Sequence, residues 1–216
     1  MGGGTVVNLK LMVLVDPAFL AEERIGRFCR EIAKGGATVV QLRDKKSATR
    51  ALINYGRALR EATYREGLEL VANDRVDVAL AIQADGVHVG QDDMAVQDVR
   101  RLAPRLYVGL SVRDSSEIPE IPDIPDYFGV GPVFPTGSKP DAGADIGIRG
   151  LHDMVKRVGS VARVVAIGGI SGANAQAVWS TGVDGMAVIS YVRDAIDVQK
   201  AVRELTESRG RDDDDI

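Results

Sequence analysis

The sequence of 216 residues is poor in cysteine, histidine and aromatic residues: it has one cysteine and two histidines, and aromatic residues make up 5% of it. The single cysteine, Cys29, excludes an internal disulfide. Its position beside Phe28 in a helical pattern indicates a core or helix-surface residue rather than a nucleophile or a metal ligand. The longest apolar run near the start, Leu11–Val15, is too short for a signal-peptide core or a membrane span. We therefore expect a cytoplasmic protein without a membrane attachment.

Neither sign of charge is in excess in the body of the chain. Lys and Arg total 27 and Asp and Glu total 31, but four of these acids form the run Asp212–Asp215. Without that run, the chain has 27 basic and 27 acidic residues, and no stretch of the sequence is strongly basic. This balance excludes a nucleic-acid binder that relies on phosphate neutralisation. We expect residues 1–10 to be an N-terminal extension and residues 208–216 to be an acidic disordered tail.

Glycine, in contrast, is abundant, with 24 residues in the chain, twelve of them between Gly129 and Gly185. Collagen is excluded because no G-X-Y period exists, and general disorder is excluded because 45% of the residues are hydrophobic. The excess therefore marks a part of the chain where the backbone turns tightly or approaches a ligand closely.

Short apolar runs alternate with helical patterns along the chain. Eight runs are predicted as strands: Leu11–Val15, Val39–Leu42, Glu69–Ala72, Val87–Val89, Leu106–Leu110, Tyr127–Val130, Arg163–Ile167 and Gly185–Ile189. Helical patterns lie between or after them, for example in Ala21–Ala33, Ala48–Arg65, Val76–Ile82, Ala173–Ser180 and Ile196–Leu205. Strict alternation implies parallel strands joined by right-handed crossovers. Eight such units favour an α/β fold, a single-domain (β/α)8 TIM barrel over residues 11–207, rather than an open doubly wound sheet.

One crossover is irregular, because Pro119, Pro122 and Pro125 recur at every third residue of the stretch 117–126. This spacing is compatible with an extended polyproline segment that binds a partner. We favour the simpler interpretation, a crossover whose fifth helix is shortened or absent.

Familiar nucleotide-binding and catalytic motifs are not completed. In 131–139 the lysine follows the serine, and the glycine spacing is one residue too long for a Walker A loop. Phe134 stands where the third glycine of a dinucleotide-binding fingerprint is needed. His88 and His152 have no metal-binding or triad partners in their motifs, so each is expected to have a structural or surface role.

Residues that directly follow the strands of a parallel barrel share one face, where the chemistry takes place. Seven of the eight predicted strands deliver polar residues or glycine to that face: Gln41, Arg43 and Lys45; Asn73 and Asp74; Gln91, Asp92 and Asp93; Ser111; Thr136, Gly137, Ser138 and Lys139; Gly168 and Gly169; Ser190. Taken singly, several of these residues could be helix caps or tight turns.

Taken together, they include three cations and two separated carboxylates: Arg43, Lys45 and Lys139, with Asp74 and Asp93. This set suits a diphosphate held together with Mg²⁺, which prefers oxygen ligands and takes one or two carboxylates plus phosphate oxygens.

A second anion site is expected at the loops after the seventh and eighth strands, where barrels commonly bind phosphate. Gly169 and the pair Ile189–Ser190 occupy these positions. One diphosphate and one monophosphate in a single mouth suit a reaction that joins two substrates with loss of diphosphate.

The motifs that contain these residues resemble those of the thiamine phosphate synthase family, from about residue 11 to about residue 205. They are QLRDK (41–45), ND (73–74), HVGQDD (88–93), GLSV (109–112), GPVFPTGSKPDA (131–142), AIGGI (166–170) and DGMAVIS (184–190). The resemblance implies a transferase of thiamine biosynthesis. Such an enzyme joins 4-amino-2-methyl-5-(diphosphooxymethyl)pyrimidine to 4-methyl-5-(2-phosphoethyl)thiazole, or to its carboxylated form, and gives thiamine phosphate and diphosphate.

The resemblance also implies a role for each matched residue. The pyrimidine diphosphate would be held by Gln41, Arg43, Lys45, Asn73, Ser111 and Lys139. Mg²⁺ would be held by Asp74 and Asp93, and the thiazole phosphate by Thr136, Gly137, Ser138, Gly169, Ile189 and Ser190. The catalytic residues, which stabilise the leaving diphosphate, would be Lys139, Ser111 and Arg43. Ser138 stands where the family usually has threonine, and Arg113 and the proline-rich stretch 117–126 also depart from the family pattern.

The mechanism implied by the resemblance is dissociative and needs no side-chain nucleophile, so the site must exclude water, and the segment 135–147 is the expected lid. Two alternatives stay open: a thiazole tautomerase of the same fold, which needs no diphosphate–metal site, and a non-catalytic phosphate-sensing barrel. The expected partners are small phosphorylated molecules, with no nucleic acid and no membrane. The oligomeric state is open, with a homodimer as one candidate.

Overall fold

A closed barrel of eight parallel strands, in the order β1 to β8, forms the centre of the computed structural model, which describes residues 7–119, 124–137 and 143–210. The strands are β1 (Leu11–Val15), β2 (Val39–Leu42), β3 (Glu69–Asn73), β4 (Gly86–Val89), β5 (Tyr107–Val112), β6 (Tyr127–Val130), β7 (Arg163–Ile167) and β8 (Gly185–Val188). The barrel closes where β1 pairs with β8, with Met12 opposite Ala187. The predicted (β/α)8 fold is confirmed.

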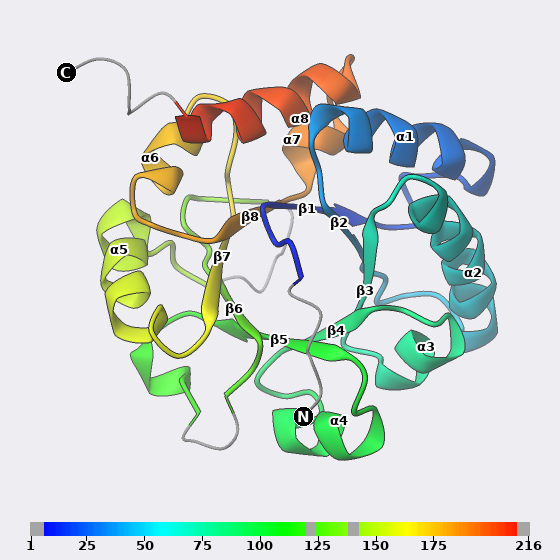
Figure 1. Cartoon of the computed structure of the whole chain (residues 1–216), viewed down its shortest axis with the longest axis horizontal. Coiled ribbons are helices and arrows are strands. Elements are labelled where there is room, and N and C mark those ends of the chain that lie inside the picture. The colour runs from blue at the N-terminus through cyan, green and yellow to red at the C-terminus, as the bar shows by residue number, and fades with distance from the viewer. Residues whose placement is uncertain (1–6, 120–123, 138–142, 211–216) are drawn as a thin grey trace.

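Helices surround the barrel on the outside (Figure 1). They are α1 (Ile25–Gly35), α2 (Thr49–Arg65), α3 (Val76–Ala81), α4 (Val96–Leu102), α5 (Gly147–Val158), α6 (Ala175–Trp179), α7 (Ser190–Arg193) and α8 (Val198–Glu207), with three-residue 3-10 turns η1 (Glu22–Arg24), η2 (Ser115–Glu117) and η3 (Ser208–Gly210). The ring closes where α8 packs on α1: a Cβ atom on Gly35 would lie 2.6 Å from the Cβ atom of Val202. None of the described helices is long and apolar enough to cross a membrane.

The crossover between β5 and β6 is the irregular one. Its described residues form no helix longer than η2, as expected for a shortened or absent fifth helix, and residues 120–123 lie outside the described part. Of the segment 208–216, residues 208–210 form η3, and the guanidinium of Arg209 lies over the Trp179 ring at 4.8 Å from its centroid. Residues 211–216 and 1–6 are not described.

Side chains alternate along each strand between two cores. In β1, Leu11, Val13 and Val15 pack against the helices, whereas Met12 and Leu14 belong to the cluster inside the barrel. Val7 and Leu9 join the interior cluster ahead of β1, and Arg163, the first residue of β7, donates a hydrogen bond to the Val7 carbonyl. These contacts close the barrel at the amino-terminal ends of its strands.

A repeated clamp ties each even strand to the odd strand before it. Three aspartates immediately precede β4, β6 and β8, and each carboxylate accepts a hydrogen bond from the second residue of the preceding strand: Asp85 from Leu70 N, Asp126 from Val108 N and Asp184 from Val164 N, all at 2.7 Å. Thr38 takes the corresponding place before β2, where its hydroxyl accepts from Leu11 N at 3.2 Å. The clamps fix the amino-terminal edge of the barrel and leave the opposite edge for ligands.

Candidate active site

A cavity of about 280 Å³ opens at the carboxyl-terminal ends of the strands. Several of its apolar lining residues, among them Met12, Leu14 and Tyr127, belong to the barrel interior, and most of its remaining lining is polar or glycine. Eleven of the predicted site residues line it: Gln41, Arg43, Lys45, Asn73, Asp74, Asp93, Ser111, Thr136, Gly169, Ile189 and Ser190. Gly137 is described but does not line the cavity, and Ser138 and Lys139 lie outside the described residues. The structure thus gathers almost all of the described candidates in one mouth.

Several of these residues lie within strands rather than after them. β5 extends to Val112, two residues beyond the predicted end, because Ser111 still pairs with Gly129 of β6. Gln41 is likewise part of β2, is only 4% exposed, and its amide nitrogen contacts the Met12 sulfur at 3.1 Å. These side chains are therefore held by the barrel itself, which fixes them more firmly than loops would.

Two carboxylates meet beside two cations on one side of the mouth. Asp74 directly follows β3 with a left-handed backbone (φ 63°), a conformation that aspartate tolerates better than most residues, and its N–H donates to the His88 carbonyl at 2.7 Å. The Lys45 ammonium lies 3.6 Å from its carboxylate. Burial raises the pKa of the Asp74 carboxyl. The charge of Asp93 and a hydrogen bond between the two carboxyl groups raise it further, although Lys45 and Arg43 lower it.

This pair can hold a divalent cation only with further ligands. Among the residues that the structure describes, no group of three or more His, Cys, Asp or Glu side chains could bind a metal ion. A hard cation such as Mg²⁺ commonly uses one or two carboxylates and takes its other ligands from phosphate oxygens and water. A positive charge between Asp74 and Asp93 would also relieve the repulsion that raises the pKa of Asp74. The donor set therefore fits Mg²⁺ bound together with a phosphorylated ligand.

Glycines shape the opposite side of the mouth. After β7, Gly168 and Gly169 have left-handed backbones (φ 104° and 64°), and a Cβ atom on Gly169 would lie 2.7 Å from both the Phe134 Cβ and the Pro135 carbonyl oxygen. The Asn174 side chain fixes this turn by donating to the Gly169 carbonyl at 3.0 Å. Backbone atoms of the turn thus face the cavity without intervening side chains, which suits an anion and explains part of the glycine excess.

The helix that follows β8 was not predicted. α7 begins at Ser190 and contains only four residues, too few to produce a helical pattern in the sequence. Ile189, predicted as the end of the strand, instead precedes this helix. Both residues line the cavity next to Gly169, so the turn after β7 and the start of α7 lie at the same side of the mouth.

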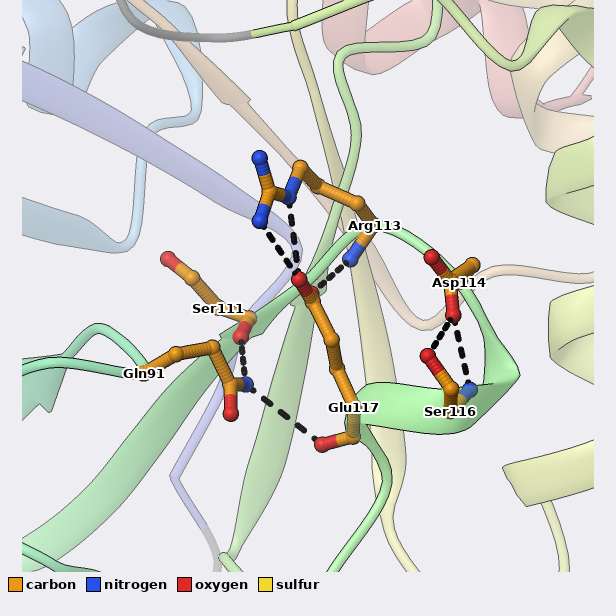
Figure 2. A network of polar contacts seen from close by, with 6 residues as sticks. All are labelled: Gln91, Ser111, Arg113, Asp114, Ser116 and Glu117. Carbon is orange, nitrogen blue, oxygen red and sulfur yellow. Dashed lines mark hydrogen bonds and ion pairs between the residues drawn. The ribbon is translucent and has the colours of Figure 1, made fainter.

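A polar network at the rim was also missed in the sequence (Figure 2). The Gln91 amide donates to the Ser111 carbonyl at 2.7 Å and lies 3.4 Å from the carbonyl of Glu117. The Glu117 carboxylate accepts from the backbone N–H of Arg113 at 2.7 Å and from its guanidinium at 2.7 and 3.0 Å. The sequence placed Gln91 on this face, but for Arg113 and Glu117 the only signal was their i, i+4 spacing, which is common on exposed helices. Gln91, Arg113 and Glu117 line the cavity and fasten the start of the irregular crossover to the site.

His88 is the second feature that sequence reasoning did not place in the site. The expected structural role agrees with its burial, since it is 9% exposed, but its ring also lines the cavity. Its Nε2 atom lies 2.8 Å from the Ser111 hydroxyl, and its Nδ1 atom lies 2.9 Å from the Tyr127 hydroxyl. His152, in contrast, is a partly exposed residue of α5.

Comparison with known proteins shows which family the chain resembles. Residues 11–192 match the family described as thiamine monophosphate synthase. The thiamine-phosphate synthase of Chloroflexus aurantiacus is 48% identical over 202 residues, which cover 93% of this chain and 92% of the relative. That of Archaeoglobus fulgidus is 44% identical over 193 residues, which cover 88% of this chain and 90% of the relative.

A solved structure is similar in both sequence and fold. The thiamine phosphate pyrophosphorylase of Pyrococcus furiosus superposes with a TM-score of 0.83 at 43% identity, over 94% of this chain and 96% of that one. The family match and these relatives extend over most of the barrel, and the site residues lie within the matched range. The chain therefore belongs to the thiamine monophosphate synthase family.

Proposed function

We propose that this protein is a thiamine phosphate synthase, a transferase that joins the pyrimidine diphosphate to the thiazole phosphate and releases diphosphate. The observation that carries the proposal is the single mouth that contains both the carboxylate–cation side of Asp74, Asp93, Arg43 and Lys45 and the glycine-lined side around Gly169. The names of the relatives, thiamine-phosphate synthase and thiamine phosphate pyrophosphorylase, support the same activity.

The pyrimidine and its diphosphate occupy the side formed by β2, β3 and β5 in this proposal. Gln41 and Asn73 bind the ring, and Arg43, Lys45 and Ser111 bind the diphosphate, together with Lys139, which lies outside the described residues. The guanidinium of Arg43 can donate to two phosphate oxygens at once, whereas a lysine acts as a point charge. In the part of the chain that the structure describes, Arg43 has no ion-pair partner, so its charge is available to a ligand.

The thiazole phosphate binds on the other side, at the Gly168–Gly169 turn and at Ile189, Ser190 and Thr136. Gly137 and Ser138 complete this set in the proposal. Backbone N–H groups in such turns bind anions well, because they approach the phosphate without side chains in the way. The two ligands then share the cavity, with the thiazole nitrogen directed toward the exocyclic carbon of the pyrimidine.

The reaction is a dissociative substitution in this proposal. The C–O bond of the pyrimidine methylene breaks, the diphosphate leaves with the electron pair, and the aminopyrimidine ring stabilises the resulting cation. The lone pair of the thiazole nitrogen then forms the new C–N bond. Ser111, Arg43 and Lys139 stabilise the negative charge that develops on the departing diphosphate. The rest of the rate enhancement comes from holding the two substrates in the right positions.

Asp74 and Asp93 are the proposed ligands of Mg²⁺. When bound, the ion neutralises charge on the diphosphate and orients it. The expected lid, 135–147, remains a prediction, because its central residues 138–142 lie outside the described part.

Product analysis tests the activity. The purified chain, given both substrates and Mg²⁺, is expected to form thiamine phosphate and diphosphate in equal amounts, and formation of neither product would reject the proposal. A tautomerase would isomerise the thiazole alone, and a phosphate sensor would bind it without turnover. Neither alternative requires the Asp74–Asp93 pair.

We also propose a cytoplasmic location, because substrates with phosphate and diphosphate groups do not cross membranes unaided. The homodimer remains a prediction to be checked by light scattering.

A further inference from the structure

Three side chains form a hydrogen-bonded series from the mouth of the cavity into the barrel. Ser111 of β5 lies at the mouth, His88 of β4 beneath it, and Tyr127 of β6 in the interior. The Ser111 Oγ and His88 Nε2 atoms are 2.8 Å apart, and the His88 Nδ1 and Tyr127 OH atoms are 2.9 Å apart. Both ring nitrogens of the histidine are therefore engaged, one toward the site and one toward the core.

Two glycines make room for the two rings. A Cβ atom on Gly129 would lie 2.8 Å from the His88 Cε1 atom, and one on Gly109 would lie 2.1 Å from the Tyr127 ring. Neither glycine has a left-handed backbone, so space for the rings is what requires them. The barrel therefore accommodates this pair through a glycine on β5, which lies between the strands of the two rings, and a glycine on β6, the strand of Tyr127.

The chemistry of Tyr127 sets the direction of the hydrogen bonds. Its hydroxyl is buried, with the residue 1% exposed, and burial raises the pKa of the phenol far above its ordinary value, so the group stays protonated. Among the described residues its hydroxyl has one hydrogen-bond partner, the His88 Nδ1 atom. A buried hydroxyl that fails to donate loses a hydrogen bond, so we expect it to donate to Nδ1.

Once Nδ1 accepts, the neutral imidazole carries its proton on Nε2. That N–H then donates to the Ser111 oxygen, and the hydrogen of the serine hydroxyl is left to point into the cavity. In the opposite tautomer, Ser111 would donate to Nε2 and would turn its lone pairs toward the ligand. Lone pairs repel a diphosphate oxygen, whereas a hydroxyl hydrogen binds it.

We infer that His88 and Tyr127 are positioning residues, which set the Ser111 hydroxyl as a hydrogen-bond donor to the departing diphosphate. The inference rests on the proposed function, because it requires an anionic group beside Ser111. Neither residue touches the reacting atoms, and both act through the serine.

Nitrogen-15 NMR of the ring tests the tautomer directly, without substrate or turnover. Only two histidines occur in the chain, so protein labelled with ¹⁵N-histidine gives two ring patterns, and His88→Gln assigns them. We expect His88 to be protonated on Nε2 and not on Nδ1, with His152 as the internal reference. A proton on Nδ1 alone, or on both nitrogens, would overturn the inference.

Tyr127→Phe removes the hydroxyl but keeps the ring, and Tyr107→Phe is its matched control. Tyr107 is a neighbouring interior tyrosine, and the centroids of the Tyr107 and Tyr127 rings are 6.3 Å apart. The Tyr107 hydroxyl has no hydrogen-bond partner among the described residues. We expect Tyr127→Phe to shift the His88 tautomer and to lower kcat roughly threefold to tenfold, with little change in KM, and Tyr107→Phe to do neither. Equal effects of the two variants would indicate a packing role and overturn the inference.

A double-mutant cycle separates the positioning role from general damage. In a Ser111→Ala background, Tyr127→Phe should cause no further loss of kcat, because the serine through which it acts is gone. Additive losses would contradict the inference. If the wild-type protein formed no thiamine phosphate, the proposed function would be rejected. The NMR experiment needs no substrate, so its result on the His88 tautomer is obtained separately from that assay.

Discussion

The Glu117 carboxylate accepts a hydrogen bond from the backbone N–H of Arg113 at 2.7 Å and another from its guanidinium, also at 2.7 Å (Figure 2). The Glu117 side chain is 15% exposed, whereas that of Arg113 is 57% exposed. The carboxylate thus stabilises the backbone at the end of β5, while the guanidinium stays at the rim of the cavity. The exposed ion pair itself contributes little, because solvent screens it.

Glu117→Ala is expected to destabilise the protein, because it leaves the Arg113 N–H without its acceptor. Because Arg113 is exposed, water can replace the lost acceptor, so the loss is that of an ordinary hydrogen bond, about 0.5–1.5 kcal/mol. Each kcal/mol lowers the melting temperature of a chain of this length by roughly 2–4 °C. Asp114→Ala is the matched control, since that carboxylate caps the exposed N–H of Ser116 in the same turn. Thermal denaturation measures both, and equal losses would show that the Arg113–Glu117 contact has no special weight.

Arg43→Gln is expected to lower kcat on the order of 10²–10³-fold, because it removes a charge that stabilises the leaving diphosphate. Lys139→Ala should have an effect of similar size. Arg50→Gln is the control: Arg50 is an exposed residue of α2 that does not line the cavity. Steady-state kinetics with both substrates gives the comparison, and near-normal turnover of Arg43→Gln would remove this residue from the catalytic set.

Most of the barrel was predictable because parallel strands buried on both faces give continuous apolar runs. β1, β2, β6 and β7 have the predicted bounds. The errors occur where polar residues stay in a strand, as in β5, or where a helix is too short for a periodic pattern, as in α7. In both cases pairing or packing with distant residues decides the local structure, and a local pattern cannot report it.

The site residues that follow directly after a strand were predictable from the sequence. Arg43, Asp74 and Gly169 could be found because strand ends meet at one face whatever the details of packing. His88 could not, because its part in the site depends on register: it lies beside Gly109, and Ser111 lies beside Gly129. Only this register brings its two ring nitrogens to a serine and a tyrosine on different strands.

Asp85→Ala is expected to lower stability by about 1–3 kcal/mol, because it leaves the N–H of the fully buried Leu70 unpaired. Asp85→Asn keeps an acceptor at this position, so its loss should be smaller. Asp153→Ala, an exposed residue of α5, serves as the surface control and should change stability little. Urea denaturation checks the series. Equal stability of Asp85→Ala and wild type would show that the clamp at β4 is dispensable.

The raised pKa of Asp74 predicts how pH acts on the metal-free protein. Between its unfolded and its folded pKa, the folded state binds more protons, so this group contributes stability that is lost as pH rises through that range. Asp74→Asn removes the titration, and asparagine tolerates the left-handed backbone at this position. Without Mg²⁺, the variant should therefore gain stability relative to wild type as pH rises above about 4, where a free aspartate ionises. A constant difference between the two proteins across this range would contradict the shift.

Added Mg²⁺ should reverse the ranking at neutral pH. In wild type, a cation between Asp74 and Asp93 replaces repulsion by attraction, and together with diphosphate it should raise the melting temperature in a concentration-dependent way, since ligands that bind the folded state stabilise it. Asp74→Asn should lose most of this response and need far more Mg²⁺ for turnover. Asp92→Asn is the control, because Asp92 lines the same cavity but is not a proposed ligand. If Asp92→Asn lost the response and Asp74→Asn kept it, the ligand assignment would move to the neighbouring carboxylate.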